Sequence, residues 1–167
     1  MAADHQLHNM INKFIYVVAF CLFSQVSFAA GNDSGSDTDN YLDQYKAAKK
    51  LVVRGKKLES KGKNEKALKL YNSAYVKLLE ANKLESRNPD ILNYLGFTSR
   101  KAGKYKQAEK YYLQGLEIKP DHNGINEYLG ELYIRTQRLD LAKERLAVLK
   151  DCDCKEYSEL EEVIKNN

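Results

Sequence analysis

Hydrophobic residues recur every three or four positions from residue 41 onward, which is the spacing of one face of an α-helix. One such stripe comprises Tyr41, Tyr45, Ala48, Leu51, Val52, Gly55 and Leu58. A second stripe comprises Ala67, Leu70, Tyr71, Ala74, Leu78, Ala81 and Leu84. The strict alternation that is typical of β-strands is weak in this part of the chain. The pattern therefore predicts an all-α fold built from successive amphipathic helices.

Residues that start and stop helices divide this pattern most clearly between positions 88 and 120. Asn88 is a favoured N-cap residue, and Pro89 suits the first position of a helix. Gly103 lies where the first helix must end and the chain must reverse, and Pro120 lies just beyond the second helix. This stretch therefore predicts two helices joined by a tight turn.

The same plan recurs on both sides of that stretch. Small residues occupy equivalent positions in successive segments, namely Gly55, Gly96 and Gly130 on the first helices and Ala67, Ala108 and Ala142 on the second. They are expected to let the two helices of each hairpin approach closely. Gly62, Gly103 and Gln137 mark the turns. The first segment is seven residues longer than the 34-residue step from Ala108 to Ala142, which adds two helical turns.

These positions resemble the tetratricopeptide-repeat family, whose period is about 34 residues. The best-matching motif residues are Leu95-Gly96, Gly103-Lys104-Tyr105, Ala108, Tyr112 and Pro120. The resemblance implies a right-handed α-solenoid of about three hairpins within residues 41–150, with repeats at about 48–88, 89–122 and 123–150. It also implies a non-enzymatic protein-interaction scaffold that holds a partner peptide or helix in a concave groove.

The resemblance places this groove on the first helix of each hairpin. The partner-binding residues that it implies are Lys49, Val52, Lys56, Asn93, Phe97, Arg100, Lys101, Glu127, Glu131, Ile134 and Arg135. Phe97 either anchors a partner segment or packs between repeats. Glu127 and Glu131, one turn apart, are expected on a solvated charged face. Val52 and Lys56 stand where chaperone-binding members carry a clamp lysine and asparagine, so binding of chaperone tails is not predicted.

The N-terminal segment has the features of an export signal. Lys13 precedes the apolar run from Phe14 to Phe23, and Ser27 and Ala29 are small residues at the positions that signal peptidase reads. The sequence predicts a signal peptide over residues 1–29, cleaved after Ala29, and a periplasmic protein. The alternative is an inner-membrane anchor over residues 14–30. Met1 and Met10 are both open as the start of translation.

Residues 30–40 are polar and acidic and lack large apolar side chains, so they are predicted to form a disordered linker. At the other end, residues 151–167 are predicted to form a Cys-x-Cys turn and a capping helix with one apolar face. That face comprises Tyr157, Leu160, Val163 and Ile164. The export signal and this tail together resemble small exported tetratricopeptide-repeat proteins of Gram-negative bacteria.

Cys152 and Cys154 are the two cysteines that remain after removal of the signal peptide, and an oxidising compartment favours their oxidation. Three roles are open: a structural disulfide at the turn, a redox-active or intermolecular pair, and metal binding. Metal binding is disfavoured because two thiolates and His122 do not make a full ligand set.

Composition and motifs argue against several other functions. The net charge of +4 is mild, and the tyrosines fall at core positions, so no nucleic-acid binding is predicted. Phosphate loops, metalloprotease motifs and nucleophile elbows do not occur in the sequence, so we expect no enzyme, no cofactor and no metal. The basic stretch 46–69 and the acidic stretch 151–162 fit either association with a membrane surface or an acidic partner, or ordinary solvated helix faces.

The expected partner is therefore a protein or a peptide, and its identity and the oligomeric state of the chain are open. The alternatives are a membrane-anchored or self-associating structural protein and a thiol redox accessory that uses Cys152 and Cys154.

Overall fold

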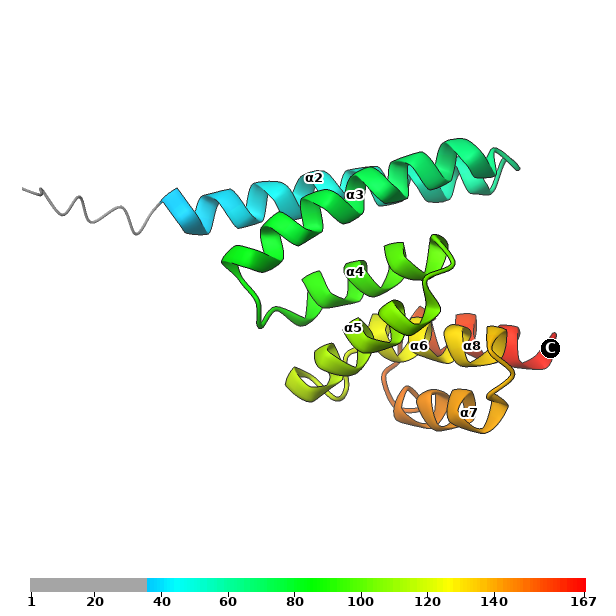
Figure 1. Cartoon of the computed structure of the whole chain (residues 1–167). Helices are drawn as coiled ribbons and strands as arrows, with labels where there is room; N and C mark the ends of the chain where they lie inside the picture. Colours follow the sequence, from blue (N-terminus) through cyan, green and yellow to red (C-terminus); the bar gives the residue numbers. More distant parts are fainter. Residues whose placement is uncertain (1–35) are drawn as a thin grey trace, which may run out of the picture. The chain divides into compact units, whose positions relative to one another are not determined.

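A computed structural model of the chain describes residues 36–167. These residues form seven helices and no strand, which confirms the all-α prediction (Figure 1). The helices are α2 (Ser36–Glu59), α3 (Asn64–Leu84), α4 (Pro89–Lys101), α5 (Tyr105–Ile118), α6 (Asn123–Arg135), α7 (Leu139–Val148) and α8 (Lys155–Lys165).

The helices pack as successive hairpins, α2 with α3, α4 with α5 and α6 with α7, and each hairpin contacts the next. Every hairpin turn contains one residue in the left-handed backbone region, with φ of 70° at Gly62, 75° at Gly103 and 60° at Gln137. The predicted α-solenoid of three hairpins is therefore confirmed. The third turn adopts the same geometry as the others although a glutamine replaces the expected glycine.

Side-chain caps fix where α4 and α6 begin. The Oδ1 atom of Asn88 accepts hydrogen bonds from the backbone N–H groups of Asp90 (3.0 Å) and Ile91 (3.2 Å). In the same way, Nδ1 of His122 accepts from the N–H of Ile125 at 3.2 Å. The other ring nitrogen of His122 lies 3.1 Å from Oδ1 of Asp90, so the cap residue of α6 also contacts the first turn of α4.

The matched glycines bring helices close together, as predicted for the first two hairpins. A Cβ atom at Gly55 would collide with the ring of Tyr71, and one at Gly96 would collide with the ring of Tyr112. The third glycine behaves differently, because a Cβ at Gly130 would lie 2.6 Å from Leu160 in α8. The prediction that Gly130 serves contact within its own hairpin is therefore wrong, since the capping helix fills the space beside it.

The first hairpin also starts earlier than predicted. α2 begins at Ser36, so residues 36–40 belong to this helix and not to the linker predicted over residues 30–40. Extending a helix that has already formed adds one hydrogen bond for each residue fixed, so a polar segment can continue it. The rest of the predicted linker and the predicted signal peptide or anchor lie outside the described residues.

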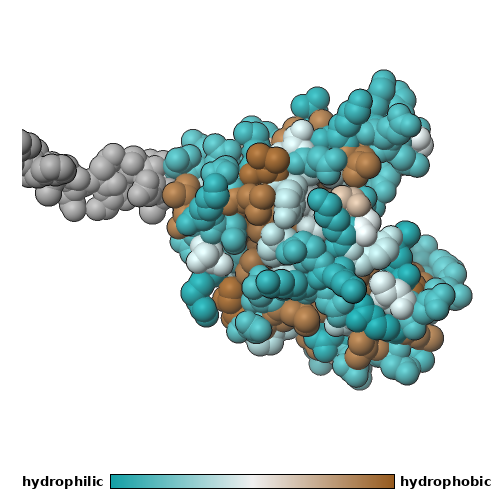
Figure 2. Space-filling model, viewed as in Figure 1, coloured by the Kyte–Doolittle hydropathy of each residue, from teal (hydrophilic) through white to brown (hydrophobic). Residues whose placement is uncertain are grey.

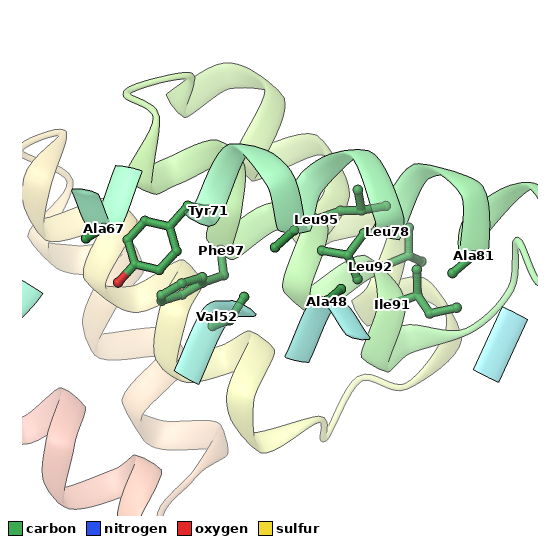
Figure 3. Close-up of a cluster of buried hydrophobic side chains, with 11 residues drawn as sticks. Ala48, Val52, Ala67, Tyr71, Leu78, Ala81, Ile91, Leu92, Leu95 and Phe97 are labelled. Carbon is green, nitrogen blue, oxygen red and sulfur yellow. The ribbon is translucent and has the colours of Figure 1, made fainter. Parts of the chain in front are cut away.

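A row of aromatic rings joins the three hairpins. Phe97 of α4 packs edge-on against Tyr71 of α3, with ring centroids 5.4 Å apart, and it lies 5.1 Å from the ring of Tyr128 in α6. Figure 3 shows Phe97 between Tyr71 and Val52 within the first core cluster. Aromatic pairs at these distances stabilise a core beyond the area that they bury.

The last helix closes the solenoid, as predicted for a capping element. α8 packs against α6 and α7, its Leu160 is fully buried, and Ile164 contacts the second core cluster. This cover is needed because the last hairpin of a repeat array otherwise exposes an apolar face. Among residues 36–167, no helix is both long enough and apolar enough to cross a membrane.

The turn at Gln137 provides a direct test of the repeat geometry. Replacement of Gln137 by glycine removes the steric cost of a positive φ at a residue with a Cβ atom. We expect the free energy of unfolding to rise by about 0.5–1 kcal/mol, measured by urea denaturation. The matched control is Gly103→Gln at the equivalent turn, which should destabilise the protein by about 1–2 kcal/mol. Equal stability of all three proteins would contradict the assignment of the turns.

Candidate functional site

The first helices of the hairpins and the capping helix enclose an inner surface with two adjoining clefts. The tyrosine cleft has a volume of about 530 Å³ and the glutamate cleft about 360 Å³. The tyrosine cleft is lined by Tyr45, Lys49, Lys56, Asp90, Asn93, Tyr94, Lys119, Asp121, His122, Asn123, Gly124, Glu127, Tyr128, Lys155 and Glu156. The glutamate cleft is lined by Lys56, Glu59, Phe97, Arg100, Lys101, Glu127, Tyr128, Glu131, Glu159, Glu162 and Val163.

Lys56, Glu127 and Tyr128 line both clefts, so the two form one continuous inner groove. On the face shown in Figure 2, the surface is mainly hydrophilic with scattered hydrophobic patches. The groove lining is likewise mostly polar, in contrast to the predominantly apolar pockets that enclose small-molecule ligands.

In the tyrosine cleft, an exposed cation lies beside two aromatic rings. The Nζ atom of Lys49 is 5.3 Å from the ring centroid of Tyr45 and 6.0 Å from that of Tyr94. The two rings meet edge to face at 5.8 Å. Asn93 also lines this cleft and is buried, and its Oδ1 atom has no hydrogen-bond partner among the described residues. This cleft thus offers a cation, phenol groups and an amide.

The boundary between the clefts is formed by Lys56 and Tyr128. Lys56 of α2 donates a hydrogen bond of 2.6 Å to the hydroxyl of Tyr128 in α6. Its Nζ atom also lies 4.9 Å from the ring centroid of Phe97 and 5.0 Å from that of Tyr128. Burial lowers the pKa of Lys56, and the negative charge of Glu127 opposes this effect. The contact joins the first and third hairpins across the groove.

In the glutamate cleft, most charges are paired within the protein. The guanidinium of Arg100, which is itself buried, forms an ion pair of 2.5 Å with Glu131. Lys101 forms an ion pair of 2.8 Å with Glu59, whose carboxylate also accepts a hydrogen bond of 2.7 Å from the hydroxyl of Tyr71. Because these pairs satisfy one another, they shape the cleft more than they leave charges free for a ligand.

Glu127 and Glu162 line the same cleft without an ion pair among the described residues, and of the two only Glu127 is buried. It is only 3% exposed, and no lysine or arginine among the described residues lies within ion-pair distance of it. Burial raises its pKa to about 9, helped by the hydrogen bond to Glu159 and by the negative charge of Glu131. Burial also disfavours ionisation of Glu159, but the hydrogen bonds from Glu127 and Lys155 outweigh it and lower the pKa of Glu159. Glu127 therefore holds a proton that it donates to the Glu159 carboxylate.

The structure brings most of the predicted groove residues together. Those that line the two clefts are Lys49, Lys56, Asn93, Phe97, Arg100, Lys101, Glu127 and Glu131. Ile134 packs against the second core cluster, and Arg135 is exposed but lines neither cleft. These two residues lie at the C-terminal end of α6.

The expectation that Val52 lies in the groove is wrong. Val52 is only 1% exposed and belongs to the core, because its side chain faces the first hairpin's interior. Of the two alternatives for Phe97, packing between repeats holds, since this side chain is also 1% exposed and cannot serve as an exposed anchor. The expectation that Glu127 and Glu131 lie on a solvated face is wrong as well, since Glu127 is buried and Glu131 pairs with Arg100.

Several groove residues were not anticipated from the sequence. Tyr94 and Tyr128 each lie two positions before a matched glycine, so the repeat alignment contained the signal that places them on the same face. Lys155, Glu156 and Glu159 come from α8. No periodicity shows against which side of the last hairpin a capping helix packs, so their position required the structure.

The Cys-x-Cys turn lies between α7 and α8. The sulfur atoms of Cys152 and Cys154 are 1.95 Å apart, within bonding distance, and Asp153 between them has a φ of 45°. Both the structural and the redox hypotheses require this pairing, so it does not discriminate between them. A role for the pair stays a prediction.

Comparison with known proteins supports the repeat assignment. The tetratricopeptide repeat model matches residues 89–122. A TPR repeat-containing protein of Pseudomonas aeruginosa is 38% identical over 61 residues, which cover 36% of this chain and 10% of that protein. The chain thus spans a small part of that relative's length.

Two solved structures are similar to this chain at low sequence identity. The TPR domain of Arabidopsis OM64 is 16% identical, with 74% of this chain and 98% of that chain covered and a TM-score of 0.49. The second TPR domain of human RPAP3, in complex with an HSP70 peptide, is 21% identical, with 74% and 97% covered and a TM-score of 0.48.

The protonated carboxyl of Glu127 gives the protein a specific pH dependence. Its pKa is about 9 in the folded chain against 4.5 as the ordinary value, so the unfolded chain releases this proton first as the pH rises. The free energy of unfolding should therefore fall between about pH 4.5 and pH 9, by at most about 1.4 kcal/mol per pH unit from this group. Glu127→Gln should remove this slope, and urea denaturation at several pH values measures it.

A matched control is Glu117→Gln, an exposed position on α5, which should keep the wild-type slope. If Glu127→Gln and the wild-type protein lose stability in parallel between pH 5 and pH 9, Glu127 does not hold the proton.

Proposed function

We propose that this tetratricopeptide-repeat protein is a non-enzymatic scaffold that binds an extended peptide or a helix of a partner protein in its inner groove. The observation that carries the proposal is the continuity of the two clefts across α2, α4, α6 and α8. Stacked repeats create extended concave surfaces of this kind, which repeat proteins use for binding. A groove that spans several hairpins suits a chain segment better than a compact small molecule.

The side chains of the groove also support a polypeptide partner. Tyr45, Tyr94 and Tyr128 offer rings with a polar end, and such residues are enriched where proteins bind one another. Lys49 is exposed beside two of these rings and forms no ion pair among the described residues. The tyrosine cleft therefore provides aromatic contact area together with an available cation for a carboxylate or carbonyl group of the partner.

We further propose that the scaffold acts in the cell envelope after export. The support for this location is the sequence of residues 1–29, with its apolar run and its small residues before the cleavage position. In this setting the partner is a component of the envelope. The alternative is that residues 14–30 stay in place and anchor the chain in the inner membrane.

Site-specific photo-crosslinking in living cells tests both parts of the proposal. The photo-reactive residue replaces Lys49 in the tyrosine cleft, and a control replaces Leu113, which is 44% exposed on α5 outside the groove. We expect a discrete crosslinked protein from the Lys49 position and none from the Leu113 position. The mass of the recovered chain also shows whether residues 1–29 have been removed.

Crosslinking from Leu113 that equals or exceeds crosslinking from Lys49 would contradict the groove assignment. A recovered chain that retains residues 14–30 would contradict cleavage of the signal peptide and support the membrane anchor. The groove assignment would be unaffected.

A further inference from the structure

The glutamate cleft has an uneven balance of charge. Five glutamates and three cations line it. Arg100 is committed to Glu131 and Lys101 to Glu59, so each pair neutralises itself. Lys155 of α8 forms an ion pair of 3.0 Å with Glu159. Lys56 alone then remains beside Glu127 and Glu162, and its ammonium group is bound to the hydroxyl of Tyr128. The cleft therefore lacks a paired cation at Glu127, where α6 meets α8.

A second observation locates this deficit at one side chain. Glu127 is only 3% exposed, yet it lines both clefts. It forms no ion pair with a lysine or an arginine among the described residues. Its neighbour across the cleft is another carboxyl group, that of Glu159 on α8. Buried carboxyl groups are normally paired with a cation or a metal ion. In the free protein a proton takes that place.

We propose that the glutamate cleft receives a lysine or arginine side chain of the partner segment, which forms an ion pair with Glu127 and Glu159. This inference rests on the proposed function, because it assumes that the groove holds a partner segment. The cleft also suits the apolar stem of such a side chain, since Val163 and the ring of Tyr128 line it. Guanidinium and ammonium groups both form strong hydrogen bonds with paired carboxylates.

The binding step is balanced by the release of one proton. The carboxyl group of Glu127 gives its proton to solvent as the cation of the partner enters, and an N–H···O hydrogen bond to the resulting carboxylate replaces it. The charged groups that face this position are Lys56 from α2, Arg100 from α4, Glu131 from α6, and Lys155 and Glu159 from α8. Lys56 is bound to Tyr128, Arg100 to Glu131 and Lys155 to Glu159. The incoming cation of the partner is therefore the one that pairs with Glu127.

Proton release makes the affinity depend on pH in a definite direction. In the free protein the pKa of Glu127 is about 9, and the bound cation lowers it. Between the bound and free values, affinity should rise as the pH rises, by up to about tenfold per pH unit for one proton. Above about pH 9 the free carboxyl group is already ionised, so the dependence should level off.

The test uses the full chain, and a phage-displayed library of random short peptides stands in for the unidentified partner. Selection on the wild-type protein should enrich peptides with lysine or arginine at one shared position. The best peptide, synthesised and measured by calorimetry, should bind Glu127→Gln at least about tenfold more weakly at pH 8. Its affinity for the wild-type protein should rise from pH 6 to pH 8, whereas its affinity for Glu127→Gln should stay constant. Glu117→Gln serves as the control and should bind like the wild-type protein.

The outcomes separate this inference from the proposed function. Groove-binding peptides without a shared basic position, or basic peptides that bind Glu127→Gln as tightly as the wild-type protein, overturn the inference and leave the scaffold function intact. If substitutions at Lys49 and Lys101 do not weaken binding of the selected peptides, the peptides bind outside the groove. In that case both the inference and the proposed function fail. The urea denaturation of Glu127→Gln separates loss of binding from unfolding, and the variant is expected to be folded at pH 8.

Discussion

The close approach of paired helices at a glycine is the constraint on which this structure depends. At Gly55 and Gly96 the backbone of a first helix lies directly against a tyrosine ring of its second helix, in a space where no Cβ atom fits. Glycine in a helix interior costs about 1 kcal/mol relative to alanine, so its use here reflects a gain in packing. In these two hairpins the glycine side of the first helix therefore faces the second helix of the same hairpin.

The inner groove follows from this arrangement. Once the hairpins are stacked, Tyr71, Phe97 and Tyr128 form a continuous aromatic row from the first hairpin to the third. The row is core on one side, and the rings of Phe97 and Tyr128 also line the glutamate cleft on the other. The Nζ atom of Lys56 lies over both of these rings and donates a hydrogen bond to the hydroxyl of Tyr128. Stability and the shape of the groove therefore depend on the same side chains.

The capping helix has two effects that cannot be separated. Leu160 fills the space beside Gly130 that a tyrosine fills in the equivalent position of the other hairpins. That contact seats α8 against α6 and places Lys155 and Glu159 at the edge of the groove. Glu127 is buried, and its hydrogen bond to Glu159 of this cap is one of the causes that raise its pKa to about 9. A change that loosens α8 should thus alter the electrostatics of the groove as well as stability.

Much of the fold was predictable because it depends on local spacing. The positions of Gly96, Gly103 and Ala108 predict the hairpin and its turn without knowledge of distant contacts. Predicted groove residues line the clefts where the repeat sets the helix face, as with Lys49 and Arg100. Whether Phe97 is exposed could not be decided from the sequence, because it depends on the rings of Tyr71 and Tyr128 that approach from other hairpins. The state of Glu127 was not predictable, because it is created by the docking of α8.

The central claim is that the inner groove binds the partner, and chemical-shift mapping tests it most directly. Backbone amide resonances of the isotope-labelled chain are compared with and without the partner segment identified by crosslinking. The account predicts that the largest shifts fall in α2, α4, α6 and α8, at residues that line the two clefts. Shifts concentrated in α5 and α7, with the cleft residues unchanged, would contradict it.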